Sequence, residues 1–259
     1  IKDIWPGNTS GYPLALTAMG NYLFFAANDS LHGEEIWRSN GTTAGTVMVK
    51  DIYPGTQGST PSTYGMGSSG EKVFFCATDG TIVGRELYAT DGTMAGTTLI
   101  KDIYSGSAGS EPLYLTALNG NVFFTAIVDT YGRELFISDG TTSGTQLLKD
   151  IRVGSSSSSP LNLITFGNKL LFTANNGSSG TELWSSDGTT ANTSMIKDIC
   201  PWAGSSPQNF IQMGNYVYFD ANDCNNGTEL WKTDGTTAGT TMVKDITPGS
   251  NGSSFGTKF

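Results

Sequence analysis

The sequence predicts an all-β fold, a five-bladed β-propeller of four-stranded antiparallel blades, on three observations. The tripeptide Lys-Asp-Ile recurs every 47 to 51 residues, and the same order of apolar runs, glycines and turn residues returns between its copies. The 34 Gly and a charged fraction of only 14% favour short strands joined by turns over long helices. A lone four-stranded sheet leaves an apolar face uncovered, so radial stacking of the repeats in one closed ring is expected.

Each repeat of about 48 residues contains four segments with the two-residue period of strands. In the third repeat they are expected at residues 113–118, 121–127, 134–138 and 146–151. Asn119-Gly120 predicts a tight hairpin between the first two, and Asp139-Gly140 predicts the turn into the fourth. An open β-solenoid is the alternative, but its coils are usually much shorter.

A single domain over residues 1–259 is expected. Its repeats span residues 1–48, 49–99, 100–147, 148–195 and 196–242, and residues 243–259 supply a closing strand and the start of a further repeat. Five sets of first, second and third strands are flanked by six segments of the fourth type, so one of these is surplus. Either the segment from Ile1 to Ile4 or that from Val243 to Ile246 is expected to complete the fifth blade, and the other is left as an unpaired edge.

The third strand and the turn after it carry the most regular motif. The segments ELWSSDGT (182–189) and ELWKTDGT (229–236) resemble the ELWxxDGT repeat of large secreted or surface-associated proteins. Other repeats depart from it with Asn40 for Asp, Tyr88 and Phe136 for Trp, and Asn192 for Gly. The resemblance implies a β-propeller-like, extracellular, modular protein, and it carries no active-site residues that could be transferred to this chain.

The recurrent acidic residues have two interpretations each. The motif glutamates are expected to accept backbone or hydroxyl hydrogen bonds rather than to form a functional ring of carboxylates; they are Glu35, Glu86, Glu134, Glu182 and Glu229. The aspartates of the Asp-Gly-Thr turns are expected to bond their own backbone, with calcium binding as the alternative; they are Asp91, Asp139, Asp187 and Asp234. No cofactor and no metal site is expected.

The aromatic residues divide into two groups. Trp37, Trp184 and Trp231 lie in third strands beside a recurrent Leu or Ile, which favours packing between blades over sugar stacking. Trp5 and Trp202 lie in loops after fourth strands, and these two are the better candidates for exposed ligand contacts.

The three cysteines indicate one disulfide. Cys200 and Cys224 are placed in loops at the same end of the expected blades, so their pairing is expected, and it requires an oxidising compartment. Two free thiols are the alternative. Cys76 is expected to be an unpaired strand residue.

Seven Asn-x-Ser/Thr sequons fall in expected loops or turns and are candidate N-glycosylation sites: Asn8, Asn28, Asn40, Asn176, Asn192, Asn226 and Asn251. Repeats two and three, from Val49 to Leu147, contain none. Glycans would therefore leave one flank of the molecule bare.

Charge and motifs exclude several partners and reactions. The net charge of −9, with no Lys/Arg cluster, argues against nucleic acid, and no apolar run reaches the length needed to insert in a membrane. The only histidine, His32, has no repeated partner, which argues against catalysis based on histidine.

The predicted function is a non-catalytic extracellular or cell-surface module, structural or adhesive, that acts as a glycosylated building block of a larger array or filament. A glycan-binding propeller lectin is the second hypothesis, and a hydrolase is the third. Self-association is expected through the terminal segments and the sequon-free flank.

Overall fold

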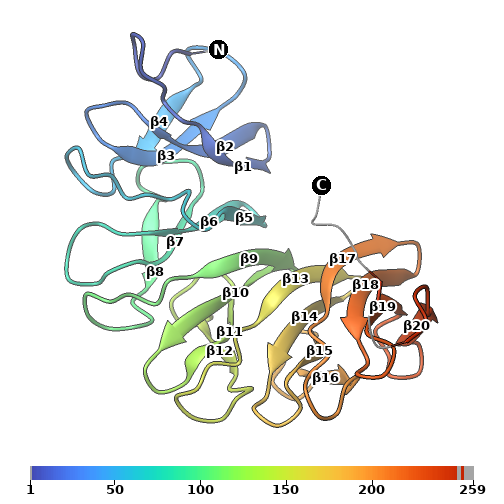
Figure 1. Cartoon of the computed structure of the whole chain (residues 1–259). Coiled ribbons are helices and arrows are strands. Elements are labelled where there is room, and N and C mark those ends of the chain that lie inside the picture. The colour runs from blue at the N-terminus through green and yellow to red at the C-terminus, as the bar shows by residue number, and fades with distance from the viewer. Residues whose placement is uncertain (1, 250–251, 254–259) are drawn as a thin grey trace. The chain divides into compact units, whose positions relative to one another are not determined.

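The computed structural model describes residues 2–249 and 252–253, and it is all-β. Twenty strands form five four-stranded sheets (Figure 1), each with its strands in sequence order, and no helix occurs among the described residues. No helix that could cross a membrane is therefore present in that part of the chain. The all-β, propeller-like prediction with four antiparallel strands per repeat is confirmed.

The chain divides into two compact units, described separately below. One contains residues 1–129 and 136–147, and the other contains residues 130–135 and 148–259. The closed ring and the single domain over residues 1–259 stay predictions.

The strands of the first three repeats have these bounds: β1 (Leu14–Met19), β2 (Tyr22–Asn28), β3 (Glu34–Ser39), β4 (Val47–Lys50), β5 (Met66–Ser69), β6 (Lys72–Ala77), β7 (Glu86–Thr90), β8 (Thr98–Lys101), β9 (Leu113–Leu118), β10 (Asn121–Val128), β11 (Gly132–Ser138) and β12 (Gln146–Lys149). Those of the last two are β13 (Leu161–Phe166), β14 (Lys169–Asn175), β15 (Thr181–Ser186), β16 (Ser194–Lys197), β17 (Gln208–Met213), β18 (Tyr216–Asn222), β19 (Thr228–Thr233) and β20 (Thr241–Lys244). The fourth strand of the fifth sheet is thus β20, from the C-terminal segment.

First strands contain an irregularity that the sequence analysis missed. In β1, β9, β13 and β17 the register against the second strand shifts near the second residue, as in a β-bulge. That residue has positive φ in each case: Ala15, Tyr114, Asn162 and Asn209. Ala and Tyr rarely adopt this conformation, so neither predicts it.

The apolar core lies between consecutive sheets. In the second unit, Leu171, Leu183 and Ile196 of the fourth sheet pack in one cluster with Phe219 and Trp231 of the fifth. Equivalent clusters join the first sheet to the second and the second to the third within the first unit. Each fully buried Phe or Leu contributes about 1.5–3 kcal/mol of burial free energy, so this stacking is what stabilises the repeats.

A recurrent hydrogen bond joins the sheets at their outer strands, and we call it the lysine strap. The Lys of each of the first five Lys-Asp-Ile segments donates from Nζ to the carbonyl of a Thr that directly precedes the following fourth strand, as Lys101 does to Thr145 at 2.7 Å. The other straps are Lys2 to Thr46, Lys50 to Thr97, Lys149 to Thr193 and Lys197 to Thr240. These lysines therefore bridge neighbouring elements rather than pointing only into solvent.

Candidate functional site

The motif glutamates hold the loops that follow the fourth strands, and we call each arrangement a glutamate clamp. Glu86 in β7 accepts hydrogen bonds from the amides of Ile103, Tyr104 and Ser110 at 3.1, 3.1 and 2.8 Å, and from the Ser110 hydroxyl at 2.5 Å. Equivalent amides and a serine hydroxyl donate to Glu35, Glu134, Glu182 and Glu229. The interpretation of these residues as blade-building acceptors is confirmed.

The clamped carboxyls are buried, with no exposed surface. Burial raises the pKa of Glu86 above its usual range, and the hydrogen bonds from Ser110 and from the loop amides oppose that shift. The pKa values of Glu35, Glu134 and Glu182 are raised for the same reason. At Glu229, burial again raises the pKa, but the hydrogen bonds from Ile246, Ser253 and Thr247 outweigh it and the pKa is lowered.

The Asp-Gly-Thr aspartates are engaged in their own turns. Asp139 Oδ1 accepts from the Thr141 amide at 2.8 Å and from its hydroxyl at 2.7 Å. The Thr141 hydroxyl in turn accepts from the Gly144 amide, and its bond to Asp139 lowers the pKa of that carboxyl. The same bonds recur at Asp91, Asp187 and Asp234. These contacts assign the aspartates to turn formation.

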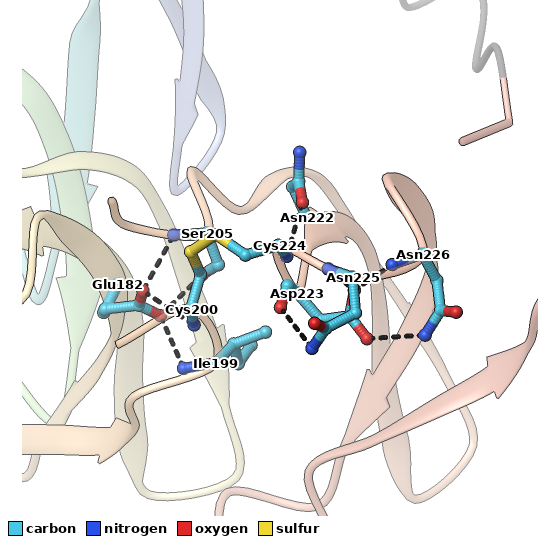
Figure 2. The surroundings of a disulfide bond; sticks show 9 residues. All are labelled: Glu182, Ile199, Cys200, Ser205, Asn222, Asp223, Cys224, Asn225 and Asn226. Atoms are coloured by element: carbon cyan, nitrogen blue, oxygen red, sulfur yellow. Dashed lines mark hydrogen bonds between the residues drawn. A yellow bond between two sulfur atoms is a disulfide. The ribbon is translucent and has the colours of Figure 1, made fainter. Parts of the chain in front are cut away.

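The disulfide prediction is confirmed. Cys200 and Cys224 are joined with a Cα–Cα distance of 5.5 Å, while Cys76 is free and buried. Figure 2 shows the bond beside the Glu182 clamp, whose carboxylate accepts from the Cys200 amide. The disulfide therefore ties the loop held by Glu182 to the loop that contains Asp223 and Asn226. Burial raises the pKa of the Cys76 thiol to about 12, so it is not a nucleophile at neutral pH.

Trp37, Trp184 and Trp231 are buried at 5–6% exposure. Trp231 packs between the fourth and fifth sheets, and Trp37 packs against Ile4. Of the two candidates for ligand contacts, Trp202 is 75% exposed, whereas Trp5 is only partly exposed. Their roles as ligand contacts stay predictions.

The sequons differ in how their amide nitrogens are used. Nδ2 of Asn192 donates to Asp187 and that of Asn226 donates to Asp223, at 2.7 and 2.8 Å. Asn176 instead uses Oδ1 to accept from two loop amides, and Asn8 is exposed. Asn28 and Asn40 also accept loop amides through Oδ1, and Asn251 lies outside the described residues. Glycosylation of these residues stays a prediction.

The single histidine is bound to a carboxylate in its loop. His32 Nδ1 lies 2.7 Å from Asp29 Oδ2, and this bond raises the pKa of the imidazole. In the fifth repeat, Asn226 occupies the position that His32 has in the first, three residues after an aspartate, and its side chain donates to that aspartate, Asp223. Asp29 and Asp223 each also accept hydrogen bonds from two loop amides. Although an imidazole oriented by a carboxylate is one part of a catalytic triad, this repetition assigns His32 to loop structure.

A polar hollow that the sequence analysis missed opens in the second unit, with a volume of about 570 Å³. Its lining includes Lys169 at the start of β14, Asp187 and Asn192 from the turn after β15, and Thr236 from the turn after β19. The replacement of the usual Gly by Asn192 was the one sequence signal at this place, because its side chain binds Asp187.

Comparison with known proteins gives similarity of fold only. No protein-family model matches the chain, and no curated protein matches it in sequence. Among solved structures, a Mycobacterium tuberculosis puromycin-hydrolyzing peptidase is similar with a TM-score of 0.56 and 11% identity, over 93% of this chain and 40% of that chain.

Two further structures show the same similarity. A structure from an analysis of two prolyl endopeptidases matches with a TM-score of 0.54 and 13% identity, over 85% of this chain and 32% of that chain. Oligopeptidase B from Leishmania major gives 0.51 at 12% identity, over 95% and 35%. The chain thus spans about a third to two fifths of the length of these proteins, all of which have propeller-type folds.

These neighbours correct the functional prediction. A non-catalytic structural or adhesive module was expected, with a hydrolase only third, whereas the three structures described above, which share this fold over most of the chain, are peptidases. The first prediction is therefore wrong. It rested on repeat regularity, on the lack of a catalytic set and on the density of sequons. The first two are properties of a propeller whether or not it belongs to an enzyme.

Proposed function

We propose that this chain is the propeller-type part of a hydrolase that cleaves peptide or aminoacyl amide bonds. The observation that carries the proposal is the similarity to peptidase structures over 85–95% of the chain. Because the match covers only 32–40% of those proteins, the proposal concerns the role of one part of an enzyme.

The side-chain contacts support a role for this chain other than breaking the amide bond. Among the described residues, the one histidine is bound to Asp29, the motif glutamates are saturated by loop donors, and the free thiol is buried. A nucleophile next to a general base is what amide hydrolysis requires. We therefore assign the bond-breaking groups to residues outside the described part of this chain.

The test is an amidase assay on the native protein that contains this chain, captured with an antibody raised against the folded 259-residue chain. Fluorogenic aminoacyl and prolyl-peptidyl amides are the substrates, and a lysate depleted with the same antibody is the control. Hydrolysis is expected to follow the captured protein, and the isolated chain is expected to be inactive. Captured, folded protein that cleaves none of these amides would refute the hydrolase, and an active isolated chain would refute the placement of the chemistry elsewhere.

We also propose an extracellular or cell-surface location, because the Cys200–Cys224 disulfide favours an oxidising compartment. N-glycans are proposed first at Asn8 and Asn176, since those at Asn192 and Asn226 would disturb a hydrogen bond to an aspartate. Glycopeptide mass spectrometry of the native protein tests both points: occupied sequons and an oxidised cysteine pair are expected. Unmodified sequons with two free thiols would refute them.

A further inference from the structure

The polar hollow is lined by residues of the fourth and fifth repeats, and all of them belong to the second unit. In the first unit, side chains fill the equivalent place. A Cβ added to Gly140, in the turn of the third sheet, would lie 3.0 Å from Lys72 and 3.1 Å from Phe74 of the second sheet. Of the described residues, a Cβ added to the equivalent Gly235 would meet only Phe166, at 3.8 Å. The fourth and fifth sheets therefore leave open a space that the second and third sheets fill.

A smaller side chain opens this space, and a lysine beside it is left without its usual acceptor. Leu171 of β14 stands where β6 has Phe74, so it reaches less far toward the next turn. Lys169 and Lys72 each begin the second strand of their sheet. Lys72 donates to the Gly140 carbonyl at 2.9 Å, whereas Lys169 has no hydrogen bond among the described residues. The ammonium group of Lys169 is therefore available to a ligand.

The hollow also contains two acceptor groups that the other repeats cannot bring together. Asn192 replaces the glycine of the other four repeats, and its Nδ2 donates to Asp187 Oδ2 at 2.7 Å. Because Oδ1 belongs to the same amide group, this bond holds a carbonyl oxygen beside the carboxylate, and both residues line the hollow. Ser185 lines it too and has no hydrogen bond within the part of the chain that the structure describes, so its hydroxyl can donate to a ligand.

The charges around the hollow are of both signs. Lys169 and Asp187 line it, and Asp234 directly precedes the lining residue Gly235. The hydrogen bonds from Thr236 and, less strongly, the Lys169 ammonium lower the pKa of Asp234, so this carboxylate also acts on the lysine. The carboxylates disfavour a simple anion at Lys169, and the ammonium disfavours a simple cation at Asp187. A ligand that carries one group of each sign satisfies both.

We propose that the hollow binds a short peptide whose two termini are free. The α-carboxylate of the peptide accepts hydrogen bonds from Lys169 Nζ and from the Ser185 hydroxyl. Its α-ammonium donates to the Asp187 carboxylate and to Asn192 Oδ1. Each terminus therefore meets one charged partner and one neutral partner, and hydrogen bonds to charged groups are the stronger kind.

The remaining lining suits the body of such a peptide. Met195 and Ile196 line the hollow and offer an apolar surface to a side chain of the ligand. The volume of about 570 Å³ lies within the usual range of small-ligand pockets, roughly 300–1,000 Å³. This inference rests on the lining alone, goes beyond the proposed hydrolase and does not depend on it, because binding here requires no bond to be broken.

The test is a ligand-observed NMR titration of the 259-residue chain with the dipeptide Gly-Leu. The chain is produced without N-glycans, because a glycan on Asn192 would occupy the hollow. A dissociation constant on the order of 1 mM is expected for a ligand of this size. N-acetyl-Gly-Leu lacks the ammonium group and Gly-Leu-amide lacks the carboxylate, so each is expected to bind about tenfold more weakly.

Three variants and one control assign the binding to the hollow. Lys169→Met, Asn192→Gly and Asp187→Asn are each expected to weaken binding about tenfold. Asn192→Gly restores the residue of the other repeats, and Asp187→Asn keeps its turn because Asn40 makes the same turn bonds in the first repeat. Lys72→Met is the matched control, since this lysine stands at the same place in the second sheet but is already bound, and it should leave binding unchanged.

Three results would overturn the proposal. The first is a folded chain that does not bind Gly-Leu at about ten times the expected dissociation constant. The second is equally tight binding of the acetylated or the amidated dipeptide, which would show that one terminus is not recognised. The third is binding that folded Lys169→Met weakens no more than Lys72→Met does.

Discussion

Replacing Glu86 by Gln tests the glutamate clamp with the smallest change of shape. The variant keeps one oxygen, which can still accept from the amides of Tyr104 and Ser110, but it places an NH₂ group where Oε2 receives Ile103 and the Ser110 hydroxyl. The hydroxyl can rotate and accept, whereas the Ile103 amide cannot and is left facing another donor.

The expected cost follows from these contacts. A stranded buried amide costs about 1–3 kcal/mol, and the remaining bonds lose the strength that the negative charge gave them. We expect the clamp to weaken by about 3 kcal/mol, which corresponds to roughly a hundredfold change in an opening equilibrium.

Hydrogen exchange measured by mass spectrometry on peptides that cover residues 102–111 reads this directly, because exchange of loop amides reports local opening. Glu71→Gln is the matched control, since Glu71 is an exposed carboxyl in a turn of the same repeat. Exchange in Glu86→Gln that stays within threefold of the control would refute the clamp as the device that holds this loop.

Three further predictions concern other contacts. The pKa of His32 is expected above its usual 6.5 because of its bond to Asp29; proton NMR of the only imidazole should show this, and Asp29→Asn should abolish the shift. Because the folded state raises this pKa, the bond's contribution is full below pH 6.5 and is lost as the pH rises through the folded value. In native protein, iodoacetamide should leave buried Cys76 unlabelled, and rapid labelling would contradict its burial. Replacing both Cys200 and Cys224 by Ser should lower the free energy of unfolding by about 3 kcal/mol, measured by guanidinium denaturation, and an unchanged midpoint would contradict a stabilising disulfide. Lys101→Met should lower the free energy of unfolding by about 1–2 kcal/mol in the same measurement, because the Thr145 carbonyl loses its donor. Lys244→Met is the control and should lower it by less than about 0.5 kcal/mol at low protein concentration. Equal effects of the two substitutions would rule out the strap.

The sequence predicts the strands well because alternating apolar residues and turn dipeptides are local signals. Its error at a strand end has a cause that lies farther along the chain. The fourth strand of the third repeat was expected to reach Ile151, but β12 ends at Lys149 because the Ile151 amide leaves the sheet to bond Glu134. That bond joins residues 17 apart, which periodicity alone does not reveal.

The candidate site was predicted less completely. The acceptor role of the glutamates, the turn role of the aspartates and the cysteine pair could be inferred because repetition aligns each of them with a fixed element. The hollow beside Lys169 could not, since it is formed by turns of two repeats whose separation in space the sequence does not give. The function was mispredicted because a propeller's regular residues maintain its blades, and the fold alone does not indicate what the blades serve.

The lysine strap has a consequence for how such chains change in length during evolution. Each of the first four sheets contributes one donor to the sheet after it, and each of the last four contributes one carbonyl to the sheet before it. Duplication of a whole repeat would therefore add one satisfied donor, one satisfied carbonyl and one apolar interface, and it would leave both ends of the series chemically unchanged. Loss of half a repeat would strand a lysine or a carbonyl, so whole repeats are the unit in which this architecture can grow or shrink.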